Sequence, residues 1–198
     1  MFERIDSHLE FDRELHRFKL DGRPVPSFTQ CLKAAGLIDD RFFTDYARDR
    51  GSSIHEATRF YDENDLDAAY LEGCQTGYLE AWDLFKRETG FKAKKIEVPV
   101  YSISLQIAGI PDRVGPFGGD DYQSVVEIKT GELYPVTGIQ LSMQQACIDP
   151  PPKRRIGVRL FEDGHYEWKE FKDRNDWQIA KAAISITHWL RAKTKGEL

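Results

Sequence analysis

Cysteines and long hydrophobic runs are both scarce in this sequence, and each shortage excludes a class of protein. The three cysteines, Cys31, Cys74 and Cys147, are far apart and odd in number. This indicates free thiols in a reducing compartment and argues against clustered zinc or iron–sulfur ligands. No apolar run is long enough to span a membrane, and the charged start, Met1–Asp6, lacks the apolar core of a signal peptide. We therefore expect a cytoplasmic protein without a membrane partner.

Basic residues are outnumbered as well. The chain has 28 Lys and Arg against 33 Asp and Glu, a formal net charge of −5, whereas a protein that coats DNA irrespective of sequence is usually basic. A nuclease is compatible with this charge because bound metal ions supply positive charge within its site. The sequence also lacks a Gly-x-x-x-x-Gly-Lys phosphate loop, a nucleotide-binding glycine fingerprint and a nucleophile elbow.

The rest of the composition is that of one ordinary folded domain. The 198 residues contain no repeat and no linker rich in Pro, Gly or Ser, so a single domain spanning 1–198 is predicted. Periodicity predicts a mainly helical part over 1–92, a sheet with one helix over 93–172, and a last helix within 173–198. This order predicts an α/β fold in which helices flank a central mixed β-sheet. Helices are expected over 28–37, 42–63, 66–89, 137–148 and 177–193, and strands over 95–101, 105–114, 123–129, 155–161 and 166–171.

One predicted strand pair carries most of the chemistry. The strands over 105–114 and 123–129 are expected to form an antiparallel hairpin centred near Gly118. This hairpin sets Asp112 opposite residues 124–127, so an acid from each strand can converge.

Glu127 and Lys129 lie two residues apart in the second of these strands. Side chains at that spacing share one face, and Val126 and Ile128 are expected to pack on the other. Glu127 and Asp112 together can hold a hard divalent cation. The neighbouring ammonium can orient a water molecule or offset charge on a phosphate, so the parts of metal-assisted phosphodiester hydrolysis are present.

The Pro-Asp pair ending at Asp112 and the tripeptide Glu127–Lys129 resemble the signature of the PD-(D/E)xK nuclease superfamily. Three further segments resemble the branch that contains RecB-type nucleases, lambda-type phage exonucleases, CRISPR-adaptation nucleases and mitochondrial genome maintenance exonuclease. They are the Gly-x-x-x-His motif Gly51–His55 after Arg50, the motif Gln140–Gln144, and the segment Val25–Gln30. The family prefers tyrosine where this sequence has Gln144.

The resemblance implies a restriction-endonuclease-like core that binds Mg²⁺ or Mn²⁺. Imidazole is a normal ligand for manganese and an unusual one for magnesium, so His55 bears on the choice of metal. Lys129 would place the attacking water or stabilise the phosphate. Gln140 would hydrogen-bond near the lysine or to a substrate phosphate. The implied metal ligands are the side chains of His55, Asp112 and Glu127 and the carbonyl of Ile128.

Several other residues have more than one interpretation. Glu97 is either a ligand of a second metal through water or an exposed acid. The acidic run over 62–65 is interpreted as a solvated face. Supporting roles, DNA contacts or base stacking are considered for Arg50, Phe117, Tyr134 and Gln144.

The expected function is a metal-dependent DNA nuclease. The first expectation is an exonuclease of phage recombination or DNA repair, which acts on single-stranded DNA or duplex ends and has a recombination protein as a candidate partner. One alternative is a structure-specific endonuclease or resolvase that uses the same site. The other is a catalytically silent nucleic-acid-binding subunit, and the presence of all the chemical residues counts against it.

Overall fold

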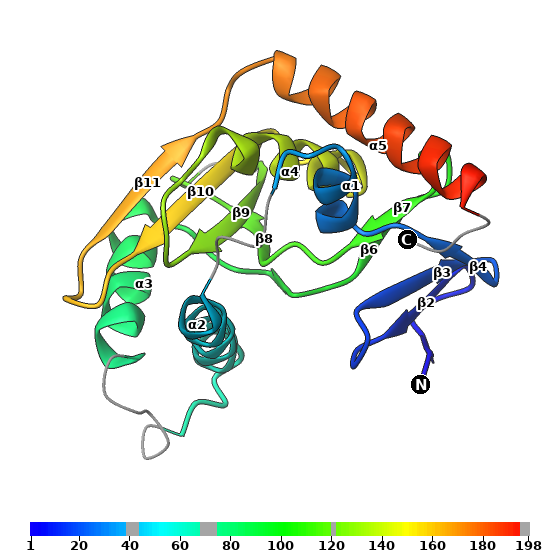
Figure 1. Cartoon of the computed structure of the whole chain (residues 1–198). Coiled ribbons are helices and arrows are strands. Elements are labelled where there is room, and N and C mark those ends of the chain that lie inside the picture. Colours follow the sequence, from blue (N-terminus) through cyan, green and yellow to red (C-terminus); the bar gives the residue numbers. More distant parts are fainter. Residues whose placement is uncertain (39–43, 68–74, 120–121, 195–198) are drawn as a thin grey trace.

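A five-stranded mixed sheet forms the centre of the computed structural model (Figure 1). Its strands are β5 Lys95–Ile96, β8 Arg113–Pro116, β9 Gln123–Lys129, β10 Arg154–Leu160 and β11 Tyr166–Glu170. The order is β11-β10-β9-β8-β5, in which β9 and β10 are parallel and the other neighbours antiparallel. The structure describes residues 1–38, 44–67, 75–119 and 122–194.

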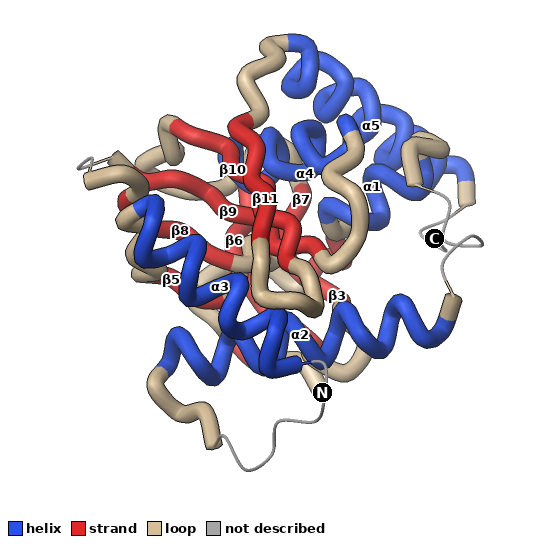
Figure 2. The backbone as a smooth tube through the Cα atoms, turned by 90° about the vertical axis from the view of Figure 1, so that its left-hand side faces the viewer, coloured by secondary structure: helices blue, strands red, loops and turns tan. Residues whose placement is uncertain are grey.

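Helices cover both faces of this sheet (Figures 1 and 2). Val125 of β9 packs in a core with α1 Phe28–Ala34, α4 Pro135–Ala146 and α5 Asn175–Lys193. Val126 and Ile128 point the other way, into a core with α2 Asp45–Glu63 and α3 Gln75–Thr89. The alternation predicted for this strand is confirmed, and so is the α/β fold with a central mixed sheet flanked by helices.

A second, antiparallel sheet occupies the start of the chain, where a mainly helical part was predicted. Residues 1–25 form strands and turns, and the helices of this part begin at Phe28. Leu9, Phe11, Phe18 and Leu20 are all buried, which is the period of two that a strand pair requires. The turn at Asp21-Gly22 has positive φ at both residues. In spatial order, the strands are β1 Glu3–Arg4, β2 Leu9–Asp12, β3 Arg17–Leu20 and β4 Arg23–Val25.

Two predicted strands are each divided in the structure. The first breaks after β5 because Glu97 adopts φ +48, and the second breaks before β8 at Pro111, which has no backbone donor for a ladder. The other parts of the two predicted strands, β6 Val100–Ser102 and β7 Ile107–Gly109, pair with each other in a separate sheet. The two breaks lie side by side, because the Glu97 N–H donates to the Asp112 carbonyl at 3.0 Å.

Each predicted helix is present in the described part of the chain, with ends that shift by a few residues. Leu66 and Asp67, predicted as the start of the third helix, are not helical. α2 runs without a break through Gly51, where an interruption was expected, and Thr44 caps its start. The predicted beginning of this helix at 42–43 and residues 68–74 of the next one lie outside the described residues. Within the described part of the chain, no helix combines the length and apolarity that a membrane crossing requires.

Candidate active site

Asp112 and Glu127 reach one place from adjacent strands. β8 begins directly after Asp112, and its first residue, Arg113, pairs with Val126 of β9. Asp112 therefore lies next to the Glu127 position, as the hairpin predicted. The Ile128 backbone N–H donates to Asp112 Oδ2 at 2.6 Å. Both acids are buried, with 9% of Asp112 and 3% of Glu127 exposed.

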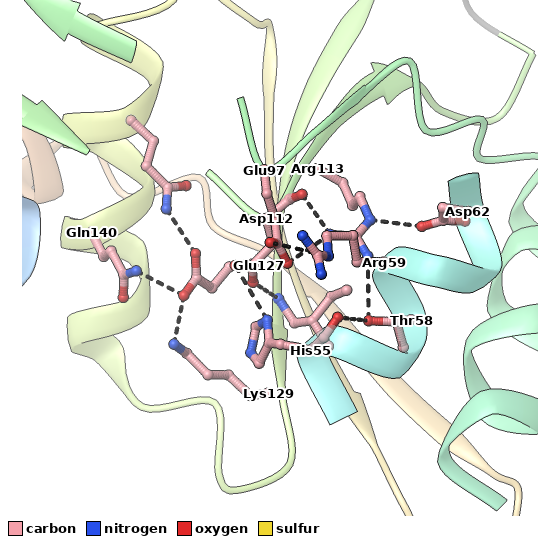
Figure 3. Close-up of polar contacts among 12 residues, drawn as sticks. His55, Thr58, Arg59, Asp62, Glu97, Asp112, Arg113, Glu127, Lys129 and Gln140 are labelled. Carbon is pink, nitrogen blue, oxygen red and sulfur yellow. Dashed lines mark hydrogen bonds and ion pairs between the residues drawn. The ribbon is translucent and has the colours of Figure 1, made fainter. Parts of the chain in front are cut away.

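Three side chains donate hydrogen bonds to the Glu127 carboxylate (Figure 3). Lys129 Nζ and Gln140 Nε2 both donate to Oε1, at 2.6 and 2.7 Å. Gln144 Nε2 donates to Oε2 at 2.7 Å. The two glutamines lie one turn apart on α4, so this helix fixes the orientation of the carboxylate. Gln144 is fully buried, which favours a supporting role over a direct DNA contact.

His55 approaches Asp112 from α2. Its Nδ1 lies 3.5 Å from Asp112 Oδ1, and 29% of the side chain is exposed. The ring thus stands beside one of the predicted metal ligands, at the accessible edge of the site. A Cβ on Gly51, one turn earlier, would meet nothing within 4 Å, so close packing does not explain the glycine of this motif.

The charges at the site are strongly coupled. Burial and the neighbouring Glu127 carboxylate raise the pKa of Asp112 to about 6, although His55 and Lys129 oppose this. Burial would raise the pKa of Glu127 too, but Lys129 and the hydrogen bond from Gln144 outweigh it, and the pKa is lowered. Burial would lower the pKa of Lys129, but the two carboxylates outweigh it and raise the pKa. Lys129 therefore stays an ammonium at neutral pH.

A buried ion pair joins α2 to β8 behind these acids (Figure 3). Arg113, which is fully buried, donates from Nε to Asp62 Oδ2 at 2.6 Å and from Nη1 to the Asp112 carbonyl at 2.7 Å. Asp62 also accepts from Trp82 Nε1 at 3.1 Å and lies 2.5 Å from Lys86 Nζ. The interpretation of run 62–65 as a solvated face is wrong for Asp62, because this carboxylate is buried and has cationic partners on two other elements.

Of the comparisons with known proteins, the one with a TM-score above 0.5 supports the fold. No protein-family model matches the chain, and no curated protein matches its sequence. A proposed exonuclease from Eubacterium rectale has a TM-score of 0.51 and 12% identity, over 89% of this chain and 77% of that chain. An alkaline exonuclease from Laribacter hongkongensis has a TM-score of 0.49 and 15% identity, over 85% of this chain and 92% of that chain.

This chain shares the fold of the Eubacterium rectale protein. The resemblance to nucleases is thus confirmed at the level of the fold, while the roles of individual residues stay predictions. In this fold, Asp112, Glu127 and Lys129 sit where two neighbouring strands of the central sheet and α4 meet.

The site fits a divalent cation in its charge and its donor atoms. Two buried carboxylates that repel each other are stabilised by a cation between them, and the raised pKa of Asp112 reflects that repulsion. Among the described residues, no group of three or more His, Cys, Asp or Glu side chains is already arranged to hold a metal ion. Glu127 Oε1 accepts from both Lys129 and Gln140, so ligation through this oxygen requires one of them to move. The Ile128 carbonyl stays a predicted ligand.

The remaining predicted residues are spread around the site. The Glu97 carboxylate lies between two guanidinium groups, 3.6 Å from Arg113 Nη1 and 3.9 Å from Arg59 Nε, so it is neither fully exposed nor unpaired. Tyr134 caps the start of α4 and is exposed, which keeps it available for stacking. The Arg50 guanidinium lies 5.7 Å from the Tyr46 ring centroid. Phe117 is buried against Trp168, so the prediction that it stacks on a base is wrong.

Gln144→Ala tests the support of the Glu127 carboxylate. We expect a roughly 10- to 100-fold loss of cleavage, because a carboxylate that loses a buried donor no longer keeps its orientation toward a metal. Gln145→Ala is the matched control on the same helix, since Gln145 bonds the Pro152 carbonyl outside the site. Equal cleavage rates for the two variants, measured on one labelled DNA with Mn²⁺, would contradict the assignment.

Proposed function

We propose that this protein is a metal-dependent DNA nuclease of the PD-(D/E)xK type that hydrolyses phosphodiester bonds. The observation that carries the proposal is the convergence of Asp112, Glu127 and Lys129 from two adjacent strands of an exonuclease-type fold. The site is reachable, because Asp112 lines a cavity of about 980 Å³ together with His55 and Gln140.

Each residue of the site would have its own role in such a hydrolysis. Asp112, Glu127, His55 and the Ile128 carbonyl would hold Mg²⁺ or Mn²⁺, which would supply Lewis-acid charge against the phosphate. Lys129 is charged, so it would act as a hydrogen-bond donor to the attacking water or to a phosphate oxygen, and not as a general base. Gln140 and Gln144 keep the Glu127 carboxylate in place through their amide groups.

An exonuclease acting on single-stranded DNA or duplex ends is the first choice within this proposal. The fold shared with the Eubacterium rectale protein, itself a proposed exonuclease, supports it. A role in phage recombination or repair, with a recombination protein as partner, follows from the motif resemblance. The presence together of Asp112, Glu127 and Lys129, the residues predicted for catalysis, counts against a catalytically silent subunit.

Digestion of linear and circular DNA tests this function. We expect the purified protein to degrade end-labelled linear DNA with Mn²⁺ or Mg²⁺, EDTA to stop the reaction, and covalently closed circles to stay intact. The assay compares single-stranded, duplex and circular DNA with each metal, and the Asp112→Asn variant purified in parallel controls for contaminating nucleases. Cutting of intact circles would favour the endonuclease or resolvase. No digestion of any of these substrates with either metal would refute the nuclease.

A further inference from the structure

The cavity of the candidate site extends from the central sheet to the N-terminal sheet. His55, Asp112 and Gln140 line one part of it, and Arg13, Leu15 and His16 from the turn between β2 and β3 line another. The small N-terminal sheet therefore contributes a wall to the space in front of the predicted catalytic residues.

The two walls differ in the sign of their net charge. The lining residues between 49 and 112 include four acids, Asp49, Glu56, Glu97 and Asp112, against one arginine, Arg59, whereas those between 11 and 33 include basic residues and, among the described residues, no acid. A polyanion can place one phosphate beside the acids, where a metal ion offsets their charge. The same acids repel its other phosphates. Its next phosphates are most stable against the basic wall.

Some side chains of the turn between β2 and β3 point into the cavity, and others do not. Arg13, Leu15 and His16 line the cavity, and Leu15 is 58% exposed. Asp12 is turned inward, where its Oδ1 accepts the Leu15 N–H at 3.1 Å. His16 adopts φ +47, a left-handed conformation that is uncommon for residues with a Cβ. Glu14 in the same turn is exposed but does not line the cavity, so the turn presents the Arg13 charge, the His16 ring and one apolar side chain to the cavity.

We propose that this turn is a binding site for a single DNA strand, in which Arg13 contacts a backbone phosphate beyond the scissile one and Leu15 contacts a sugar or base. The inference rests on the proposed nuclease function. Arg13 is available for this contact, since its pair with Glu3, at 3.4 Å, has both side chains about 60% exposed and costs little to break. A cavity of about 980 Å³ is of the size that holds one ligand molecule, which suits one strand better than a duplex.

Arg13→Gln is the decisive variant, with Arg17→Gln as the matched control. Arg17 is exposed on the same hairpin and loses the same charge, but it does not line the cavity. In digestion of labelled single-stranded DNA with Mn²⁺, we expect Arg13→Gln to raise KM roughly fivefold and to reduce the slope of log KM against log salt by about 0.7. We expect kcat to change less than about twofold, and Arg17→Gln to behave as wild type.

Two further measurements separate the possible failures. Cleavage of a small chromogenic phosphodiester, too short to reach the turn, is expected to be the same for Arg13→Gln and wild type. Leu15→Glu, which puts an acid on the basic wall, is expected to raise KM for the strand further. Equal KM values for Arg13→Gln and Arg17→Gln would overturn the strand site while leaving the nuclease intact. Inactivity of the wild type on both substrates would overturn the nuclease itself.

Discussion

Asp112→Asn is expected to abolish DNA cleavage while the protein stays folded. The asparagine side-chain oxygen can still accept the Ile128 N–H that now binds Asp112 Oδ2 at 2.6 Å, so the break before β8 keeps its geometry. Only the charge is removed. A metal-ion contribution of several kcal/mol to the transition state is lost with it, which corresponds to roughly 10³-fold in rate or more.

The same variant is expected to be more stable than wild type without metal. Because the pKa of Asp112 is raised to about 6 from an ordinary value near 4, the folded state holds its proton more tightly than the unfolded state. The free energy of unfolding therefore falls as the pH rises through this window, and the ionised acid destabilises the fold at neutral pH. Asparagine removes that cost, so thermal unfolding in EDTA should show a higher midpoint for the variant.

Mn²⁺ should raise the unfolding midpoint of wild type and have a much smaller effect on Asp112→Asn, since a ligand stabilises only the state that binds it. Asp49→Asn is the matched control, because Asp49 is an exposed acid that lines the same cavity and has no predicted role as a ligand. Cleavage by Asp112→Asn within about tenfold of wild type would show that the metal site lies elsewhere.

Local patterns in the sequence predicted the centre of the site. The alternation of β9 decides which way Glu127 and Lys129 point, and the loop near Gly118 decides that Asp112 faces them; both are properties of a short stretch of chain. The break at Glu97 was missed because a positive φ at glutamate depends on its tertiary partners. The N-terminal segment was not predicted to form a sheet, because its strands are two to four residues long and give only a loose period of two.

The contacts that hold the site residues in place were harder to predict from the sequence. Gln144 departs from the family's tyrosine, and only the packing of α4 on β9 shows that its amide reaches Glu127. Asp62 and Arg113 are 51 residues apart, and no local pattern distinguishes a buried acid in a charged run from a solvated one. The elements that carry chemistry are therefore predictable from local spacing, whereas the contacts that hold them together depend on long-range pairing.

Asp62→Ala is expected to cost about 3–5 kcal/mol of stability, the usual effect of removing one partner from a buried ion pair. Arg113 would lose its Nε partner in a fully buried position, and Lys86 and Trp82 would lose an acceptor as well. For a chain of this size the loss corresponds to a fall of roughly 10 °C in the unfolding midpoint. Asp45→Asn is the control on the same helix, and its carboxylate, 92% exposed, should contribute less than about 1 kcal/mol.

A second variant separates stability from catalysis. Asp62→Leu combined with Arg113→Met replaces the ion pair by apolar side chains and should recover part of the lost stability, because buried pairs are often no more stabilising than well-packed apolar residues. It should not recover cleavage to the same degree. Arg113 Nη1 and the Glu97 N–H both hold the Asp112 carbonyl, and Arg113 also reaches Thr58 Oγ1 at 3.3 Å, next to His55 on α2. A stable double variant with full activity would show that the pair does not align Asp112 with His55.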